Sequence, residues 1–155
     1  MKPRILCVCL GNICRSPLAE GILLDQLAKA GLNDVVVDSA GTGGWHAGEA
    51  PDRRSVAIAL HHGIDISRQR ARKFRADDFE AFDWIFAMDQ DNLSALERLK
   101  PTHFKGRLER MLDGVVEGPK DVPDPYYGGD DGFLHVYNLL DQAAQKTVGE
   151  IQRLS

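Results

Sequence analysis

Residues 9–16 read Cys-Leu-Gly-Asn-Ile-Cys-Arg-Ser; they continue an apolar run that begins at Ile5 and are followed by Pro17. The apolar run is typical of a strand buried on both faces, whereas Ser16 is favoured at the N-cap and Pro17 at the first position of a helix. A loop between a strand and a helix directs backbone N–H groups at one point, and the helix N-terminus adds partial positive charge there. We therefore expect a loop that binds an oxyanion such as phosphate, formed by Leu10, Gly11, Asn12, Ile13, Cys14 and Arg15.

Cys9 and Arg15 bracket this loop with the spacing C-x5-R. Backbone N–H groups, the helix end and the guanidinium all favour the thiolate of Cys9, which makes it a nucleophile at the floor of the loop. The planar fork of Arg15 suits two oxygens of a phosphoryl group, and the hydroxyl of Ser16 can cap the helix or donate to the thiolate. The alternative is a structural cysteine beside a capped helix. Arg15 argues against it, because an unpaired guanidinium beside a core cysteine is costly.

Two other kinds of site fit the loop less well. A nucleotide-binding loop needs Gly-Lys-Ser or Gly-Lys-Thr, which the sequence lacks. A zinc site made from Cys7, Cys9 and Cys14 lacks the usual ligand spacing and a fourth ligand, so we expect no metal and no cofactor. Cys7 is interpreted as a core residue of the strand. Cys14 either packs within the loop or forms a protective disulfide with Cys9 under oxidation.

The composition is that of an ordinary globular chain, with 155 residues, 43% hydrophobic and 27% charged residues, and a formal net charge of −4. We expect a single domain over residues 1–155. The acidic balance gives no support for nucleic-acid binding, and no segment is long enough to span a membrane. Three cysteines, two of them in one loop, indicate a reducing, cytoplasmic location. The basic segment from Arg68 to Arg75 is interpreted as a solvated face, or alternatively as a region that attracts acidic phosphopeptides.

Strands and helices alternate along the rest of the chain. Strand patterns occupy residues 34–40, 83–88 and, weakly, 108–112, and helical periodicity follows residues 17–31, 51–63, 90–99 and 133–151. The second of these helices is expected to carry one apolar face, formed by Val56, Ala57, Leu60 and Ile64. This order predicts an open α/β sheet, with the oxyanion loop at the carboxyl end of a strand.

A proton donor for a leaving group is expected if the loop supports phosphoryl transfer, because displacing an alkoxide or aryl oxide requires one. Asp124 is the best candidate, since Pro123 and Pro125 stiffen the chain on both sides of it. The alternative interpretation is an ordinary aspartate in a turn.

Two motifs together make the chain resemble the low-molecular-weight protein tyrosine phosphatases: residues 8–17, and Asp124-Pro125-Tyr126-Tyr127 near the C-terminus. The resemblance extends over essentially the whole chain. It implies a three-layer α/β/α fold with a four-stranded parallel sheet, and a two-step, metal-independent hydrolysis of phosphotyrosine and small aryl phosphates. Carried over by position, Cys9 attacks phosphorus and Arg15 binds the phosphoryl oxygens. Asp124 protonates the leaving oxygen and then activates water against the phosphocysteine.

The resemblance also implies supporting residues. Four positions match a polar network that braces the loop in the family: Asn12, Ser16, Ser39 and His62. Four others match the pocket walls: Ile13, Trp45, Tyr126 and Tyr127. Flat aromatic walls favour an aromatic ring and form a slot that is too deep for phosphoserine, although the three aromatic residues could equally be surface anchors. The expected partners are phosphotyrosine-containing proteins, with phosphate or vanadate as inhibitory anions.

Relatives with the same fold but other activities differ at a few positions. Arsenate reductases of this kind use downstream cysteines, and this chain has none after Cys14. Arginine phosphatases of the family usually carry threonine in place of Ile13 and lack the tyrosine pair, so the residues here favour phosphotyrosine over phosphoarginine. A phosphoarginine phosphatase is the alternative enzyme. A non-catalytic phosphotyrosine-binding module is the alternative from another class, and it would need neither Cys9 nor Asp124.

Overall fold

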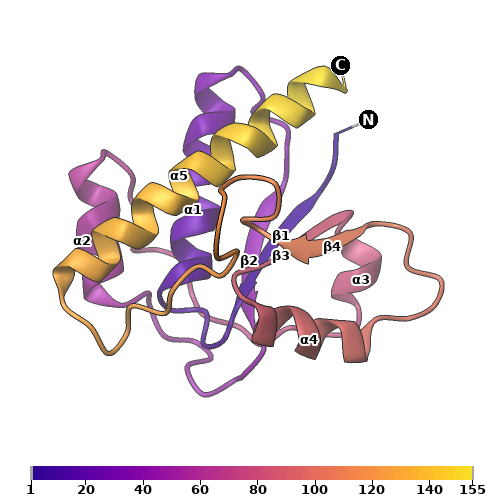
Figure 1. The fold of residues 1–155 in the computed structure, drawn as a ribbon, viewed down its shortest axis with the longest axis horizontal. Coiled ribbons are helices and arrows are strands. Elements are labelled where there is room, and N and C mark those ends of the chain that lie inside the picture. The colour runs from indigo at the N-terminus through magenta and orange to yellow at the C-terminus, as the bar shows by residue number, and fades with distance from the viewer. Residues whose placement is uncertain (1, 155) are drawn as a thin grey trace.

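The computed structural model describes residues 2–154 and contains one sheet of four parallel strands (Figure 1). The strands are β1 (Ile5–Cys9), β2 (Val37–Gly41), β3 (Trp84–Ala87) and β4 (Arg107–Arg110). The helices are α1 (Arg15–Lys29), α2 (Arg53–His61), α3 (Asp78–Ala81), α4 (Gln90–Leu99) and α5 (Asp130–Arg153). The predicted four-stranded parallel α/β fold is therefore confirmed. None of the helices in the described part of the chain is both long and apolar enough to cross a membrane.

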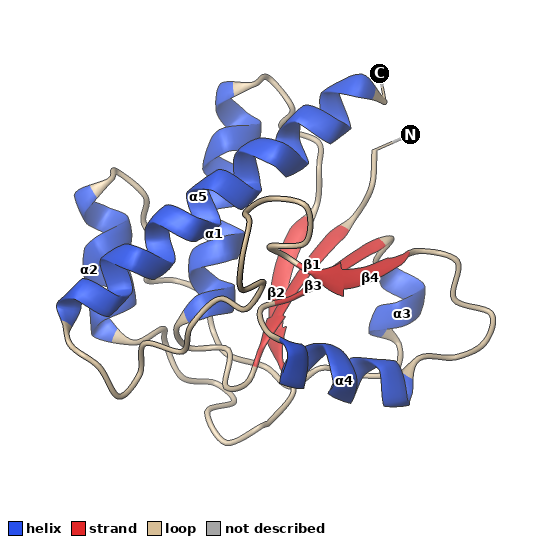
Figure 2. Ribbon diagram, viewed as in Figure 1, coloured by secondary structure: helices blue, strands red, loops and turns tan. Residues whose placement is uncertain are grey.

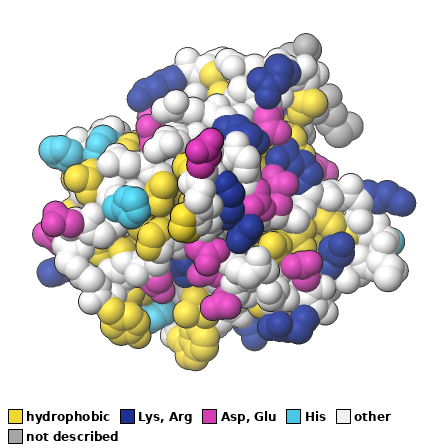
Figure 3. Space-filling view, viewed as in Figure 1, with side chains coloured by type: hydrophobic (Ala, Val, Ile, Leu, Met, Phe, Trp, Pro, Cys, Tyr) yellow, Lys and Arg dark blue, Asp and Glu magenta, His cyan; other side chains and the backbone are white. Residues whose placement is uncertain are grey.

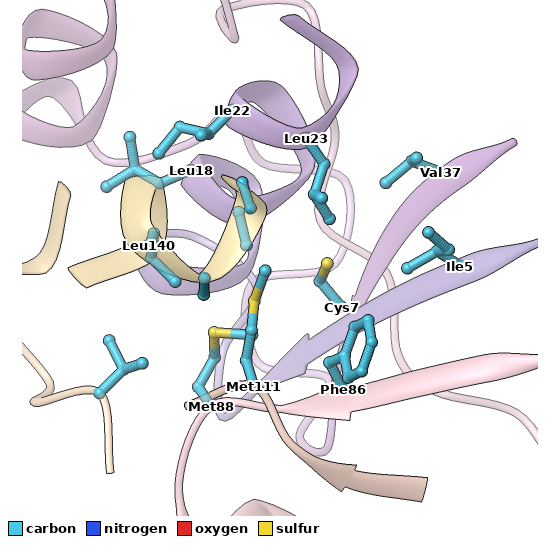
Figure 4. Packing of buried hydrophobic residues seen from close by; sticks show 14 of the residues in the cluster. Ile5, Cys7, Leu18, Ile22, Leu23, Val37, Phe86, Met88, Met111 and Leu140 are labelled. Atoms are coloured by element: carbon cyan, nitrogen blue, oxygen red, sulfur yellow. The ribbon is translucent and has the colours of Figure 1, made fainter. Parts of the chain in front are cut away.

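The helices cover the two faces of the sheet, which makes three layers (Figure 2). Side chains of a strand alternate between its faces, and β1 divides its apolar residues accordingly. Cys7 and its odd-numbered neighbours enter the core shared with α1 and α5. Leu6 and Val8 enter a second core with α4 and the aromatic residues around α3. Figure 4 shows the first core, where side chains of α1 and α5 converge on the sheet: Leu18, Ile22, Leu23 and Leu140 against Ile5, Cys7 and Phe86.

The strand order β2-β1-β3-β4 gives the sheet a topological switch point beside β1. The chain leaves β1 to form β2 on one side and later returns to form β3 on the other, with Ile5 in register with both Val37 and Trp84. Ligand sites of open α/β sheets lie beyond the carboxyl ends of the strands at such a point. The loop after β1 therefore lies where the fold places binding sites.

Three details of the predicted elements are wrong. The predicted apolar face of α2 is only partly buried: Val56 packs against the core and Ile64, just beyond the helix, is buried, but Ala57 is exposed and Leu60 is 61% exposed. The buried residues of the helix itself are Ser55 and Ala59, and the helix packs against both α1 and α5. The fourth strand ends at Arg110 and is followed directly by the buried Met111 and Leu112. The four-residue α3 was not predicted, since it is too short to show helical periodicity.

Candidate active site

The loop between β1 and α1 wraps around the thiol of Cys9, which is 3% exposed. Asn12 adopts a left-handed backbone conformation with φ of 58°, and this turn directs its N–H at Cys9 Sγ over 3.3 Å. Asparagine tolerates this conformation better than most residues. The helix begins at Arg15 with Cys14 in the N-cap position, so the predicted capping role of Ser16 is wrong, and its hydroxyl lies 3.0 Å from Cys9 Sγ instead.

The end of β2 supports the first half of this loop. Thr42 N donates to Cys9 O and Gly43 N donates to Leu10 O, both over 2.9 Å. The backbone of Gly41 passes so close to the loop that a Cβ atom on this residue would lie 2.9 Å from Leu10 O. Only glycine leaves room for two backbones at this separation.

A polar network beneath the loop joins Ser16, Asn12 and Ser39. Ser16 Oγ lies 3.0 Å from Cys9 Sγ, and Asn12 Nδ2 donates to Ser16 Oγ over 2.8 Å and to Ser39 Oγ over 3.0 Å. The amide oxygen of Asn12 accepts from Arg72 N over 3.0 Å. Each of these side chains is buried among atoms that satisfy it, so the network holds the loop in one conformation.

Arg15 lies at the other end of the loop with only 2% of its surface exposed. Its Nη1 donates to Asp89 Oδ2 over 2.6 Å and to Val122 O over 3.0 Å, while Nη2 lies 3.6 Å from Asp124 Oδ2. Burial would lower the pKa of Arg15, but the negative charges of Cys9, Asp89 and Asp124 outweigh it and raise that pKa above its ordinary value. The guanidinium is therefore a permanent cation at the floor of the site.

A cavity of about 290 Å³ opens above Cys9. Asp124 lies at its rim, where Oδ1 accepts from Tyr126 N over 3.1 Å. The walls are formed by residues that include Ile13, Trp45, His46, Tyr126 and Tyr127. Trp45 is 71% and Tyr127 is 93% exposed, and Figure 3 shows apolar side chains protruding at the lower edge of the molecule, near the loops that follow β2 and precede α5. The arrangement is a narrow slot with an aromatic mouth, a thiol and a guanidinium at its base, and one carboxyl at its side.

The family model described as low molecular weight phosphotyrosine protein phosphatase matches residues 4–155. The chain belongs to this family. The phosphatase of that description from Schizosaccharomyces pombe is 43% identical over 153 residues, which cover 96% of each chain. A crystal structure of a protein tyrosine phosphatase from Entamoeba histolytica, with Hepes in its active site, superposes with a TM-score of 0.92 at 35% identity over 97% of each chain. A Drosophila arginine phosphatase superposes with a TM-score of 0.90 at 32% identity, also over 97% of each chain.

The structure does not bring His62 to the network under the loop. Its ring stacks on Tyr137 with the centroids 3.9 Å apart, and Nδ1 pairs with Ile58 O over 3.0 Å at the exposed C-terminal end of α2. The amide oxygen of Asn12 is bonded by the backbone N–H of Arg72 and not by His62. The side chain of Arg72 is held by Asp38 and Asp78. This part of the basic segment therefore has a structural role.

Several residues of the site were missed or only partly described from the sequence. Asp89 has two roles: one of its oxygens caps α4 through Asn92 N and the other holds Arg15. Arg54 binds Tyr126 O and Gly128 O and so anchors the loop that carries Asp124. Glu20 ends the network by accepting from Ser39 Oγ over 2.7 Å. The aspartate at the start of α4 has the residue type of a helix cap, but no local pattern points to its second bond with Arg15.

The two remaining cysteines are buried thiols. The pKa of Cys14 is raised to about 12, mainly by burial and additionally by the nearby charge of Asp52. Cys7 lies in the core with no exposed surface, and burial also raises its pKa. Among residues 2–154, no cluster of three or more His, Cys, Asp or Glu side chains has the arrangement of a metal site.

Proposed function

We propose that this chain hydrolyses phosphotyrosine through a phosphocysteine intermediate on Cys9. The observation that carries the proposal is the convergence of a thiol, a guanidinium and a carboxyl on one slot of about 290 Å³. A phosphoryl dianion at its base would accept hydrogen bonds from the loop and from Arg15, whose charge the geometry maintains.

In the first step, the thiolate of Cys9 forms a bond to phosphorus and the bond from phosphorus to the tyrosyl oxygen breaks. Asp124 gives its proton to the departing oxygen, which leaves as the phenol. In the second step, the Asp124 carboxylate takes a proton from water as that water attacks phosphorus. The sulfur–phosphorus bond breaks, inorganic phosphate is released, and the Ser16 hydroxyl stabilises the returning thiolate.

The preference for phosphotyrosine rests on the walls. Ile13, Tyr126 and Tyr127 line the slot, and apolar flat surfaces favour an aryl ring over the charged guanidine of phosphoarginine. The structural similarity to an arginine phosphatase makes phosphoarginine the second candidate. Rates measured on phosphotyrosine, phosphoarginine and phosphoserine peptides separate the two, and a larger kcat/KM for phosphoarginine would contradict the preference.

The decisive experiment is p-nitrophenyl phosphate hydrolysis in the presence of EDTA by the wild-type chain, Cys9→Ser and Cys14→Ser. We expect metal-independent turnover in the wild type, none in Cys9→Ser, and measurable turnover in Cys14→Ser, which keeps the nucleophile. Phosphate and vanadate should inhibit competitively, and Cys9→Ser should still bind phosphate. No turnover by the wild type would favour a non-catalytic phosphotyrosine-binding module. A reducing, cytoplasmic location is part of the proposal, because Cys9 has to remain a free thiol to react.

A further inference from the structure

The hydrogen-bond network beneath the loop ends in a carboxyl group that none of the proposed chemical steps uses. Glu20 lies on the second turn of α1, partly buried, and its Oε1 accepts from Ser39 Oγ over 2.7 Å. Among the described residues, no ion pair reaches it closely enough to neutralise it directly. A carboxyl in such a position needs an explanation, because burying its charge is costly.

The directions of the hydrogen bonds can be worked out from one fixed point. Asn12 Oδ1 accepts from the backbone N–H of Arg72, so the amide nitrogen must face the two hydroxyl groups and give one proton to each. Each hydroxyl oxygen is then an acceptor from Asn12 and has its own proton left to donate. Ser39 donates to Glu20. Ser16 donates to Cys9 Sγ at 3.0 Å, with Ala40 O at 3.4 Å as the weaker alternative acceptor.

The two ends of the network are therefore both acceptors: the thiolate of Cys9 and the carboxylate of Glu20. We propose that Glu20 is a positioning residue for the nucleophile: its ionised carboxylate takes the Ser39 proton, keeps Ser39 Oγ an acceptor for Asn12, and so steadies the bonds through Asn12 to Ser16 that hold the Ser16 hydroxyl beside the thiolate. The inference rests on the proposed function, since it takes Cys9 as the nucleophile.

Protonation of Glu20 would weaken this arrangement. The neutral carboxyl can itself donate a proton to Ser39 Oγ, and this carboxyl proton then competes with the Asn12 amide for the Ser39 oxygen. The Ser39 proton is left with a poorer acceptor than a carboxylate. The amide of Asn12 would be held less firmly, and Ser16 with it. The rate of thiolate attack should therefore be higher with Glu20 ionised than with Glu20 neutral.

The surroundings of Glu20 put its ionisation in the neutral range. The pKa of Glu20 is raised to about 7, and burial is the main cause. The charge of Asp38 on β2 adds to the rise, whereas the hydrogen bond from Ser39 and the charge of Arg72 oppose it. From β1, the thiol of Cys7 faces the same space and is neutral, because burial raises its pKa. The network is thus expected to change state between about pH 6 and 8.

The test compares the wild type with Glu20→Gln, whose amide oxygen can still accept from Ser39 but cannot ionise. The wild-type kcat for p-nitrophenyl phosphate should show an ionisation step near neutral pH of about fivefold, the gain typical of a charged over a neutral acceptor. Glu20→Gln should lack that step, and its kcat should stay near the lower, acidic-pH value of the wild type. Asp38→Asn is the matched control, because Asp38 pairs with the side chain of Arg72, whereas only the backbone N–H of Arg72 belongs to the network. It should keep the step and move its midpoint to lower pH.

Two measurements do not depend on turnover. The rate at which iodoacetamide alkylates Cys9 should follow the same step in the wild type and not in Glu20→Gln. The 13C chemical shift of the Glu20 carboxyl in the wild type should titrate at the same midpoint, which tests the inference even if the variant fails to fold. A step that persists in Glu20→Gln, or a Glu20 carboxyl that titrates near its ordinary value of 4.5, would overturn it. An inactive wild type would instead count against the proposed function, while alkylation and NMR still report on Glu20.

Discussion

Replacing Asp89 by asparagine tests how the site holds its buried cation. Asp89 Oδ1 caps α4 by accepting from Asn92 N over 2.8 Å, and Oδ2 binds Arg15 Nη1 over 2.6 Å. Asparagine is as good a helix cap as aspartate, so its oxygen can keep the first bond. Its amide nitrogen then faces the guanidinium, and two donors oppose each other. The substitution therefore removes the ion pair and leaves the helix start intact.

The expected loss of stability can be estimated from the contacts that remain. A buried charge left without any partner costs about 3–5 kcal/mol, but Arg15 keeps Val122 O at 3.0 Å and Asp124 at 3.6 Å. The cost should then be that of one charge-assisted hydrogen bond, about 2 kcal/mol. For a chain of this length, that corresponds to a fall in Tm of about 4–8 °C. Phosphate affinity should fall by about tenfold, since Arg15 loses the contact that orients its fork.

Thermal unfolding with and without phosphate measures both effects, because a ligand that binds the folded state raises Tm by an amount that grows with the logarithm of its concentration divided by its Kd. Asp91→Asn is the control, since Asp91 lies in the first turn of α4 without contacting Arg15, and it should lose only the small helix-dipole contribution. The reasoning is refuted if Asp89→Asn melts within about 1 °C of Asp91→Asn and shows the same stabilisation by phosphate.

Three further predictions concern the acid, the loop and the network. Asp124→Asn should lower kcat/KM, which reports the first step, by about 10²–10⁴ for phenyl phosphate and less for p-nitrophenyl phosphate, whose leaving group needs no proton. Equal losses in kcat/KM would contradict the role of Asp124 as the acid. Gly41→Ala should lower both Tm and kcat/KM, because its Cβ would lie 2.9 Å from Leu10 O. Gly44→Ala is the control and should change neither measurement, because its Cβ would meet only the flexible Lys73 side chain at 3.4 Å. Because the pKa of Glu20 is raised, the folded chain keeps a proton that the unfolded chain loses at lower pH. The free energy of unfolding should therefore fall by up to about 3 kcal/mol as the pH rises from about 4.5 to 7. Urea titrations of Glu20→Gln should lack that decline.

The loop and the sheet could be predicted from the sequence because their signals are local. An apolar run, a glycine–asparagine turn and Pro17 follow one another along the chain, and each constrains the backbone of its own neighbourhood. The strand order, which was not predicted, then places this loop at the switch point of the sheet. Local signals were thus enough to predict the loop and its position at the carboxyl end of a strand.

The rest of the site depends on contacts between distant segments, which leave no pattern in the sequence. The apolar face predicted for α2 holds at Val56 and Ile64 but not at Leu60, because tertiary packing buries the small residues Ser55 and Ala59 instead. His62 has the right residue type for a polar network, yet α2 ends on the surface and the His62 ring stacks on Tyr137. The donor that bonds the Asn12 amide oxygen is the backbone N–H of Arg72, and a backbone donor cannot be recognised from residue types.

The unequal partners of Arg15 suggest why the site needs two carboxylates with different positions. Asp89 is only 18% exposed at its side chain and lies 2.6 Å from Nη1, whereas Asp124 is 39% exposed and lies 3.6 Å from Nη2. A phosphoryl dianion can therefore displace Asp124 from the guanidinium far more easily than Asp89. Asp89 then keeps Arg15 oriented while substrate is bound. Asp124, released from its cation, is then free to approach the leaving oxygen, as the proposed role of general acid requires. In the proposed mechanism, substrate binding would in this way free the acid from its ion pair, and the dependence of the Asp124→Asn defect on the leaving group is its measurable consequence.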